Sequence, residues 1–415
     1  MRFFHFSFFP HSLSYGQGIW RSLPVFKEKF ARLDAAGWFR PRPALRVLEK
    51  KSLQWAKRMT KVAIGLMSGT SCDGVDVAIL DTDGMSEISF LGGLTLPYED
   101  DLRGRLQEGS QHDVPIAELL RLEREVSEHH LKATHVLLEQ YPKLRKKVSL
   151  VGFHGHTIRH YPREGLTLQI GNPWILAKGL GLPIITDFRR CDMSLGGQGA
   201  PLVAMFHRAL FPDEPRPTLV LNLGGVANVT WLGKDEAIIA GDTGPGCGLI
   251  DEWAQTMADL PHDRDGQLAS AGQVDFETVS AALATPFFSQ PLPKSADRYD
   301  FDHVDVSGLS VEDGAATLCA ITAEAIFRAV KELPSMPERM FVTGGGVHHP
   351  VLMQMLEERF GGIKNVREIG LNPDTLEAEC FAWLAVRHQG GLPLTIPETT
   401  GCAAPSCGGV LARIL

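Results

Sequence analysis

The chain has 415 residues, of which 44% are hydrophobic and 22% charged, and its formal net charge is −8. This composition excludes collagen, wholesale disorder and a coiled-coil rod, and no run of about 20 apolar residues predicts a membrane span. The length predicts two domains. The seven cysteines include no C-x-x-C pair, which predicts free thiols in a reducing, cytoplasmic location rather than disulfides or a zinc site.

The first 58 residues differ from the rest in charge. They contain 12 Lys+Arg and 3 Asp+Glu, whereas the remaining 357 contain 29 and 46; this acidic body argues against nucleic acid as a partner. The aromatic stretch 3–9 has no small-residue cleavage site and makes a poor secretory signal, while its Arg-rich, acid-poor setting leaves an organellar transit peptide open. We favour a compact protein that starts at Met59, with 1–58 as a disordered or mis-assigned extension.

From residue 59 onward, β-branched runs alternate with helical spacing, which predicts an α/β fold. Strands are expected at 62–66, 75–81, 148–153, 182–186, 218–223, 226–232 and 338–342, and helices over 116–139, from Pro350, and over 376–386. The hairpins at 62–81 and 218–232 suggest a duplicated architecture. The proline-rich segment 212–217 is the predicted domain crossing.

Four glycine-rich turns follow predicted strands, at 69–76, 224–228, 241–246 and 343–346. Glycine allows positive φ and lets backbone N–H groups approach an anion. One such turn is typical of ordinary hairpins and helix caps, but four turns with interleaved hydroxyls favour a polyphosphate ligand. Neither a Walker A sequence nor a G-x-G-x-x-G fingerprint is present.

Three aspartates accompany these turns. Asp73 and Asp76 in the first turn would repel phosphate unless a divalent cation lay between them, and Asp242 in the third turn could serve the same ion. Mg²⁺ usually keeps several waters and few carboxylate ligands, so contact mostly through water is expected. The alternative for each aspartate is capping of its own turn.

Asp187 follows the strand predicted at 182–186, and Arg189 and Arg190 come directly after it. Open α/β sheets bind ligands at the carboxyl ends of their strands. Asp187 is therefore a candidate general base, and one arginine a candidate anion clamp. An internal Asp–Arg ion pair that holds the loop is the alternative.

Three histidines stand close together at His154, His156 and His160. Their spacing is not a standard zinc pattern, so contact with a polyhydroxylated ligand, or a structural role, is favoured over a metal. His154 and His156 are expected to share one face of the chain.

Several segments, in order, carry a family resemblance. They are GLMSGTSCDGVDVAILD (65–81), GFHGHTIRH (152–160), LQIGNP (168–173), DFRRCDMSLGGQGAPLV (187–203), LNLGGVANVT (221–230), DTGPG (242–246), PKS (293–295), TGGG (343–346) and EAECFAWLA (377–385). From Met59 onward the chain resembles the anhydro-N-acetylmuramic acid kinases, sugar kinases of the actin/sugar-kinase/heat-shock ATPase superfamily. It departs from their pattern at Cys72, His156, Cys247 and 297–299.

The resemblance implies an α/β, ribonuclease H-like clamshell with ATP and Mg²⁺ in a cleft, domain I being 59–205 plus 376–415 and domain II 206–375. Asp187 matches the catalytic aspartate. The implied nucleotide-binding residues are Gly69, Thr70, Ser71, Cys72, Asp73, Gly74, Val75, Asp76, Gly224, Gly225, Asn228, Gly344, Gly345 and Gly346. The implied substrate-binding residues are His154, His156, Arg189, Asp242, Thr243 and Gly244.

The implied reaction uses ATP and water to convert 1,6-anhydro-N-acetylmuramic acid into N-acetylmuramic acid 6-phosphate, in peptidoglycan recycling. A cytoplasmic homodimer that binds neither nucleic acid nor membrane is expected. Two alternatives stay open: a kinase for another sugar, in which Asp187 deprotonates a hydroxyl directly, and a chaperone or actin-like ATPase without small-molecule chemistry.

Overall fold

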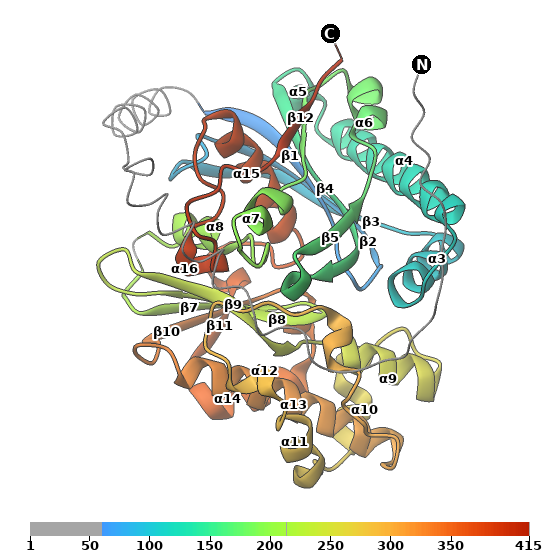
Figure 1. Cartoon of the computed structure of the whole chain (residues 1–415), viewed down its shortest axis with the longest axis vertical. Helices are drawn as coiled ribbons and strands as arrows, with labels where there is room; N and C mark the ends of the chain where they lie inside the picture. Colours follow the sequence, from blue (N-terminus) through green and yellow to red (C-terminus); the bar gives the residue numbers. More distant parts are fainter. Residues whose placement is uncertain (1–59, 213, 415) are drawn as a thin grey trace, which may run out of the picture. The chain divides into compact units, whose positions relative to one another are not determined.

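Two mixed β-sheets organise the protein in the computed structural model, which describes residues 60–212 and 214–414 (Figure 1). The expectations for 1–58 lie outside these residues. Among the described residues, no helix is both long enough and apolar enough to cross a membrane. We call each sheet with the helices packed on it a lobe.

The first lobe contains a seven-stranded sheet. Three antiparallel strands, β1 to β3, are followed by β4 parallel to β1 and β6 parallel to β4, while β5 and β12 pair antiparallel with β4 and β6. The strands are β1 (Lys61–Ser68), β2 (Gly74–Thr82), β3 (Ile88–Pro97), β4 (Val148–Tyr161), β5 (Leu166–Ile170), β6 (Ile184–Thr186) and β12 (Val410–Ala412).

The second lobe repeats this order in a five-stranded sheet. The strands are β7 (Thr218–Leu223), β8 (Val226–Leu232), β9 (Ile238–Pro245), β10 (Arg339–Thr343) and β11 (Ile363–Asn365). Strands β7 to β9 are antiparallel neighbours, and β10 and β11 then run parallel to β7. The duplication suggested by the two hairpins is confirmed at the level of topology.

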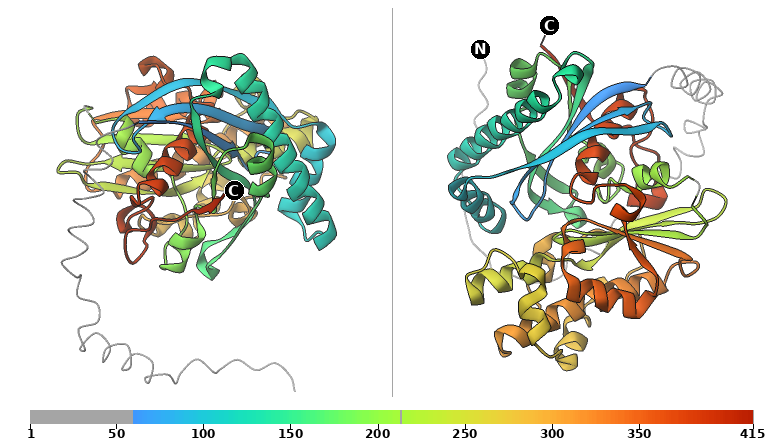
Figure 2. Two further views of the ribbon diagram at one scale, coloured as in Figure 1. Left: turned by 90° about the horizontal axis from the view of Figure 1, so that it is seen from above. Right: turned by 180° about the vertical axis from the view of Figure 1, so that it is seen from behind.

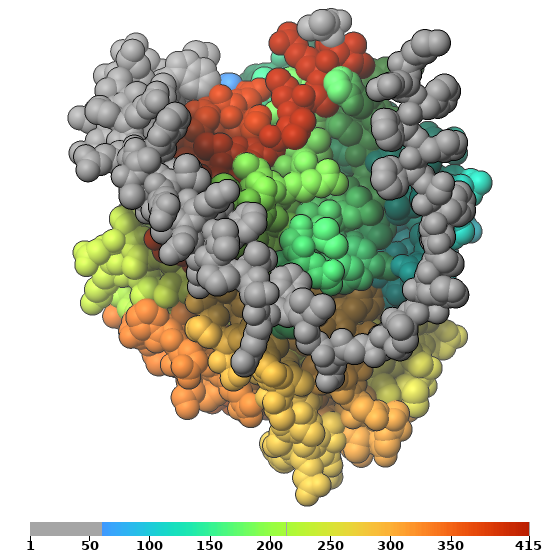
Figure 3. All heavy atoms as spheres, in the orientation of Figure 1, coloured from blue at the N-terminus to red at the C-terminus, as the bar shows by residue number. Residues whose placement is uncertain are grey.

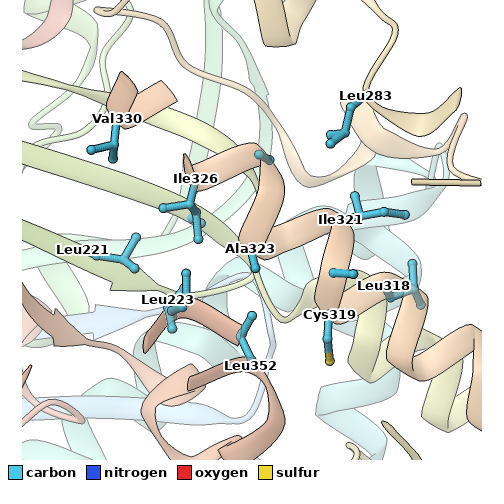
Figure 4. Packing of buried hydrophobic residues seen from close by; sticks show 14 of the residues in the cluster. Leu221, Leu223, Leu283, Leu318, Cys319, Ile321, Ala323, Ile326, Val330 and Leu352 are labelled. Atoms are coloured by element: carbon cyan, nitrogen blue, oxygen red, sulfur yellow. The ribbon is translucent and has the colours of Figure 1, made fainter. Parts of the chain in front are cut away.

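Helices cover both faces of the first sheet and form a large core on the second. They are α3 (Asp100–Gln111), α4 (Ile116–Gln140), α5 (Pro142–Arg145), α6 (Pro173–Leu180), α7 (Arg190–Ser194), α8 (Ala204–Leu210), α9 (Gly248–Ala258), α10 (Gln267–Ala271), α11 (Phe276–Ala282), α12 (Pro286–Ser289), α13 (Val311–Lys331), α14 (Pro350–Phe360), α15 (Leu376–Gln389) and α16 (Pro397–Thr400). Short 3₁₀ helices are η1 (Pro162–Glu164), η2 (Arg264–Gly266), η3 (Arg298–Phe301), η4 (Gly345–His348) and η5 (Val366–Ile369). In the second lobe, Ile326 of α13 lies beside Leu221 and Leu223 of β7, and Leu318 and Ile321 of the same helix belong to the same buried cluster (Figure 4).

Helix α15 returns from the second sheet to the first, where it packs on β1, β2 and β4 (Figure 2). Two glycines permit this close approach, because a Cβ at Gly65 would collide with the carbonyl oxygen of Ala378 and one at Gly152 with that of Phe381. The red C-terminal residues accordingly lie beside green residues of the first lobe in Figure 3. No independent division of the described residues into domains tests the predicted limits near 205 and 375, so they stay a prediction.

The expected elements are confirmed with one difference in length. The strand expected at 148–153 continues to Tyr161, because the histidine-rich stretch that follows pairs with β5 instead of forming a loop. Helix α14 begins at Pro350, as predicted from the tolerance of proline in the first helical turn.

Candidate active site

The first glycine turn joins β1 to β2 at the carboxyl end of β1. It closes through a hydrogen bond from the Cys72 N–H to the Gly69 carbonyl oxygen (3.1 Å), with Cys72 at φ +57°. Gly74, Val75 and Asp76 belong to β2, and Val75 is fully buried. The turn proper, 69–73, is therefore the part that can approach an anion with its backbone.

The second glycine turn faces the first from the other lobe. A Cβ at Gly225 would lie 3.0 Å from Thr70 Oγ1, so the two turns are in direct proximity. Gly224 and Gly225 also accept hydrogen bonds from the N–H groups of Cys247 (2.8 Å) and Gly246 (3.0 Å). A methyl group at Gly225 would be tight against Thr70 Oγ1, so a side chain at this position would crowd the space between the turns.

The turn at 344–346 lies next to the second turn because β10 is parallel to β7 and both strands end at the same edge. Gly344 has φ +84°, and a Cβ there would lie 2.7 Å from the Leu223 carbonyl oxygen. Gly345 faces open space. Three glycine turns therefore converge where the two lobes meet, which is the arrangement expected for a nucleotide with its phosphates between the first two.

Asn228 on β8 carries an unpaired polar atom. Its buried Oδ1 has no hydrogen-bond partner among the described residues, and a buried amide left unpaired costs about 1–3 kcal/mol. Asn228 is paired with Asp242 in the β8–β9 register. The glycine turns fit a polyphosphate, whereas the unpaired Oδ1 of Asn228 is an acceptor and suits a hydroxyl or water donor or a cation.

Asp187 lies at the end of β6, at the same edge of the first sheet as the first turn. Its φ is +56°, a left-handed conformation that is strained for a residue with a side chain. The carboxylate is one quarter exposed, and its ion pair with Arg190 is long, with Nη1 3.5 Å from Oδ2. The alternative role of Asp187, an ion pair that holds the loop, is thus supported only by this long contact. The carboxylate can therefore act on a ligand.

Arg189 points away from Asp187. Its Nε donates to His154 Nε2 (3.0 Å) and its Nη1 to the Gly199 carbonyl oxygen (2.7 Å). Burial holds the pKa of His154 well below its usual value, with the Arg189 charge acting in the same direction. Neutral His154 therefore accepts this hydrogen bond and holds the guanidinium in position.

Asp242 is buried near Arg189 and Lys294. Its Oδ2 accepts the Ala296 N–H (2.9 Å), and burial raises its pKa to about 7, although that hydrogen bond and the two cations oppose the rise. Thr243 and Gly244 instead pack inward: Thr243 Oγ1 donates to the Ala227 carbonyl oxygen (3.1 Å), and a Cβ at Gly244 would touch Phe288. The expectation of a turn at 241–246 is wrong, because the segment is part of strand β9 as far as Pro245 and pairs with β8. Asp242 on this strand lies near the charges of Arg189 and Lys294.

The carboxylates predicted for Mg²⁺ have separate partners. Asp73 pairs with Arg103 (2.9 Å), and Asp76 accepts from Thr95 Oγ1 (2.6 Å). Among the described residues, no group of three or more His, Cys, Asp or Glu side chains could hold a metal ion. The chain thus offers single carboxylates, which fits an ion held mainly by water and phosphate oxygens. Burial raises the pKa of Asp76 to about 7, against the hydrogen bond from Thr95, and the nearby charges of Glu377, Asp374 and Asp73 add to the rise.

The expectation that His154 and His156 share one face is wrong. Gly155 adopts φ +79°, and the β1–β4 register shifts between Leu66 and Ser68, so the alternation of side chains is interrupted. His154 lies against Phe381 of α15 (4.6 Å between ring centroids), whereas His156 Nδ1 lies 2.9 Å from Ser68 Oγ. Both histidines are buried, and their expected contact with the sugar stays a prediction.

Several polar residues at the site escaped prediction. Asn222 Nδ2 donates to Glu377 Oε1 (3.0 Å) and ties β7 to α15, and Lys294 Nζ donates to the Phe287 carbonyl oxygen (2.7 Å). Lys294 and Glu377 lie in the motifs PKS and EAECFAWLA, so the family resemblance could have indicated them as site residues. Arg103 had none, because it lies in a helix whose sequence is unremarkable in charge and spacing.

Two sheets of one topology, with facing glycine turns and a free carboxylate at the edge of the first, define a two-lobed phosphoryl-transfer fold of the actin-like ATPase and sugar-kinase class. The model of the anhydro-N-acetylmuramic acid kinase family matches residues 61–413. The chain belongs to this family.

Individual relatives agree. The chain is 45% identical over 361 residues to an anhydro-N-acetylmuramic acid kinase of Gluconobacter oxydans, covering 84% of this chain and 98% of the relative. It is 44% identical to one of Acidiphilium cryptum, covering 85% and 98%. Component A of (R)-2-hydroxyglutaryl-CoA dehydratase from Acidaminococcus fermentans is a distant structural likeness, with 12% identity, a TM-score of 0.41, and coverage of 79% of this chain and 99% of that one.

Proposed function

We propose that the protein uses ATP and water to convert 1,6-anhydro-N-acetylmuramic acid into N-acetylmuramic acid 6-phosphate and ADP. The observation that carries this proposal is the position of Asp187, a carboxylate with only a 3.5 Å ion pair, at the same sheet edge as the turn that faces Gly225. A general base beside a phosphate site suits a kinase. The identity of the sugar is inferred from the family to which the chain belongs.

The anhydro sugar determines what Asp187 must do. Its O6 is bonded to C1, so no 6-hydroxyl exists from which a proton could be removed. Asp187 accepts a proton from water as the water oxygen bonds to C1, the C1–O6 bond breaks, and O6 keeps the electron pair. O6 then takes the γ-phosphoryl group and ADP leaves.

In this proposal the turns 69–73 and 224–225 bind the phosphates through their backbone N–H groups. Mg²⁺, when bound, offsets the phosphate charge, and Asp76 would hold it through water. Gly344–Gly346 form the adenosine side. Arg189, fixed by His154 and Gly199, and Asp242, fixed by Ala296, contact the sugar.

We place this reaction in the cytoplasm, in the recycling of peptidoglycan. The cysteines at 72, 191, 247, 319, 380, 402 and 407 are all unpaired, which suits a reducing compartment. Use of ATP as phosphoryl donor suits the same location. A homodimer remains our expectation for the assembly, to be checked by light scattering.

The test is ADP release by the full chain with Mg²⁺-ATP, with and without 1,6-anhydro-N-acetylmuramic acid. The expected product has gained one phosphoryl group and one water, with the label at C1 when the reaction runs in ¹⁸O-water. If only sugars with a free 6-hydroxyl are phosphorylated, the substrate is such a sugar and the reaction includes no attack by water. ADP release that no sugar stimulates would overturn the kinase assignment.

A further inference from the structure

Four buried polar side chains lie in a row behind the first glycine turn. Tyr98 Oη donates to Ser68 Oγ (3.0 Å), and Ser68 Oγ lies 2.9 Å from His156 Nδ1. The other ring nitrogen, Nε2, lies 3.7 Å from Cys72 Sγ, and this thiol donates to the Thr70 carbonyl oxygen (3.6 Å). All four side chains are buried. We call them the buried network, which reaches the backbone of the turn at Thr70.

Burial keeps the members of this network neutral. It raises the pKa of the Cys72 thiol to about 12 and holds the pKa of the Tyr98 hydroxyl above its usual value. It lowers the pKa of His156 to about 4. Because a neutral imidazole has one N–H group and one acceptor nitrogen, His156 donates to only one of its two neighbours.

The neighbours determine which ring nitrogen carries the proton. Among the described residues, the partners of Ser68 Oγ are the Tyr98 hydroxyl and the His156 ring. Tyr98 donates its only hydroxyl proton to Ser68, so the Ser68 proton has His156 Nδ1 as its acceptor, and a buried hydroxyl left unpaired is costly. Nδ1 is therefore the acceptor and Nε2–H donates to Cys72 Sγ. The Cys72 S–H is then directed to the Thr70 carbonyl oxygen.

This last bond sets the orientation of one peptide group in the turn. The Thr70 carbonyl oxygen belongs to the same peptide as the Ser71 N–H, and in a planar trans peptide the two groups point in opposite directions. Since the thiol holds the carbonyl oxygen, the Ser71 N–H is directed away from the buried network. It has no acceptor among the described residues. Thr70 itself faces Gly225, whose Cβ would lie 3.0 Å from Thr70 Oγ1.

Tyr98 fixes the far end of the same turn. Its backbone N–H donates to the Asp73 carbonyl oxygen (3.1 Å), and its ring packs beside His129 of α4, with 4.7 Å between ring centroids. The turn needs such support, because Cys72 at φ +57° adopts a conformation that persists in a residue with a side chain only when its surroundings hold it.

We propose that Cys72 and His156 are positioning residues for ATP, which act through the buried network to direct the Ser71 N–H toward the phosphates. This rests on the proposed function, which places the phosphates between the first two glycine turns. The Cys72 and His156 side chains are fully buried, so they act on the nucleotide through the backbone of the turn. The competing assignment is the expected contact of His156 with the sugar, and the two assignments differ in which substrate a variant weakens.

The test uses the full chain and measures KM for ATP, KM for 1,6-anhydro-N-acetylmuramic acid and, by calorimetry, the Kd of ADP. Cys72→Ala removes the donor to Thr70, and we expect KM for ATP and Kd of ADP to rise about three- to tenfold, with KM for the sugar within about twofold. Cys72→Ser keeps a donor and should recover most of the affinity. Cys380→Ala on α15 is the matched control: it removes another buried thiol, which donates to the Leu202 carbonyl oxygen (3.8 Å), and should leave all three constants unchanged.

His156 is tested by two substitutions and one spectrum. A glutamine can accept from Ser68 with Oε1 and donate to Cys72 with Nε2, whereas a leucine can do neither. We therefore expect His156→Leu to raise the Kd of ADP as Cys72→Ala does, and His156→Gln to restore it. In the wild type, ¹⁵N NMR of labelled histidine should show an unprotonated Nδ1 and a protonated Nε2, assigned by the loss of these signals in His156→Gln.

Four other outcomes are informative. A raised KM for the sugar with unchanged affinity for ADP overturns the proposal and assigns His156 to the sugar. A proton on Nδ1 of His156 overturns it, because the network would then run in the opposite direction. Equal losses in Cys72→Ala and Cys72→Ser overturn it in favour of packing. A wild type that binds ADP but turns over no sugar overturns the proposed function instead, while the Kd of ADP still tests the positioning residues.

Discussion

The backbone at Asp187 allows the base to be tested without disturbing the fold. Asn tolerates the left-handed conformation about as well as Asp, so Asp187→Asn should keep the φ of +56° while removing the basic oxygen. We expect kcat to fall roughly 10²- to 10⁴-fold and ADP affinity, measured by calorimetry, to stay within about twofold. Near-normal turnover in this variant would remove Asp187 from the role of general base.

The contact between Gly225 and Thr70 makes a second prediction at the scale of single residues. A methyl group 3.0 Å from Thr70 Oγ1 is tighter than normal packing and would separate the two turns. Gly225→Ala should therefore raise KM for ATP about tenfold, since small misplacements at a site of reaction are costly.

The matched control for that substitution is Gly308→Ala, at an exposed glycine with nothing within 4 Å of the added methyl group. Its KM for ATP should match that of the wild type. An unchanged KM in Gly225→Ala would show that the turns do not bind the phosphates between them.

Residues recognised from the sequence were those whose chemistry is local. Asp187 follows a buried strand, and the glycine turns are visible in any hairpin. Arg103 and Asn222 could not be found in this way, because their partners Asp73 and Glu377 are fixed by the packing of α3 and α15. His154 and His156 were assigned to one face because the positive φ of Gly155 has no signature beyond the glycine itself.

Helix α15 contains a buried carboxyl whose ionisation opposes folding. Burial raises the pKa of Glu379 from its usual 4.5 to about 7, against a hydrogen bond from Thr375 Oγ1 (3.0 Å). The folded protein therefore holds a proton that the unfolded chain has lost between pH 4.5 and 7, so stability falls over that range and stays lowered above it.

Glu379→Gln keeps the shape of the side chain and removes this titration. We expect its free energy of unfolding in urea to exceed that of the wild type by on the order of 2 kcal/mol at pH 8, and the difference to shrink toward zero at pH 5. Glu358→Gln on the exposed face of α14 removes a carboxylate but keeps an oxygen that can accept the hydrogen bond from Gln354 (3.0 Å), and it should show no such pH dependence. Equal effects at both pH values would contradict the buried-carboxyl account.

Among the elements, short hairpins and amphipathic helices such as 116–139 were predictable because their pattern is local. The continuation of β4 to Tyr161 was not, since histidine and threonine at 154–160 are read as a polar loop until β5 pairs with them. The packing of α15 on β1 and β4 depends on Gly65 and Gly152, positions that lie far from the helix in the sequence.

At the scale of the described unit, a few polar bonds connect the lobes. Asp297 of the second lobe accepts the His160 N–H of the first (3.0 Å), and Asn222 donates to Glu377 (3.0 Å). In the proposed function, the first bond lies on the sugar side of the site and the second on the adenosine side. Apolar packing joins the lobes as well, since Ala204 and Phe211 share a buried cluster with Val220 and Phe341 of the second sheet. We expect the lobes to close around substrates by moving about this shared packing and so to exclude water that would otherwise consume ATP.

The boundary of this unit leads to the last prediction. The family match begins at residue 61, where β1 starts, and β1 is a central strand already paired with β2 on one side and β4 on the other. A protein starting at Met59 therefore retains every described strand of the first sheet. We expect its kcat/KM to lie within about twofold of the full chain and its Tm within about 2 °C, since a change of 1 kcal/mol shifts Tm by roughly that amount in a chain of this size.

The comparison should be made by calorimetric melting and by ADP release on the same preparations. If the shortened protein is insoluble or inactive, residues 1–58 contribute to folding or catalysis. A loss of activity at unchanged Tm would show that residues 1–58 contribute to catalysis. A lowered Tm together with lowered activity would show that they stabilise the fold. Equal behaviour assigns the whole reaction to the two lobes.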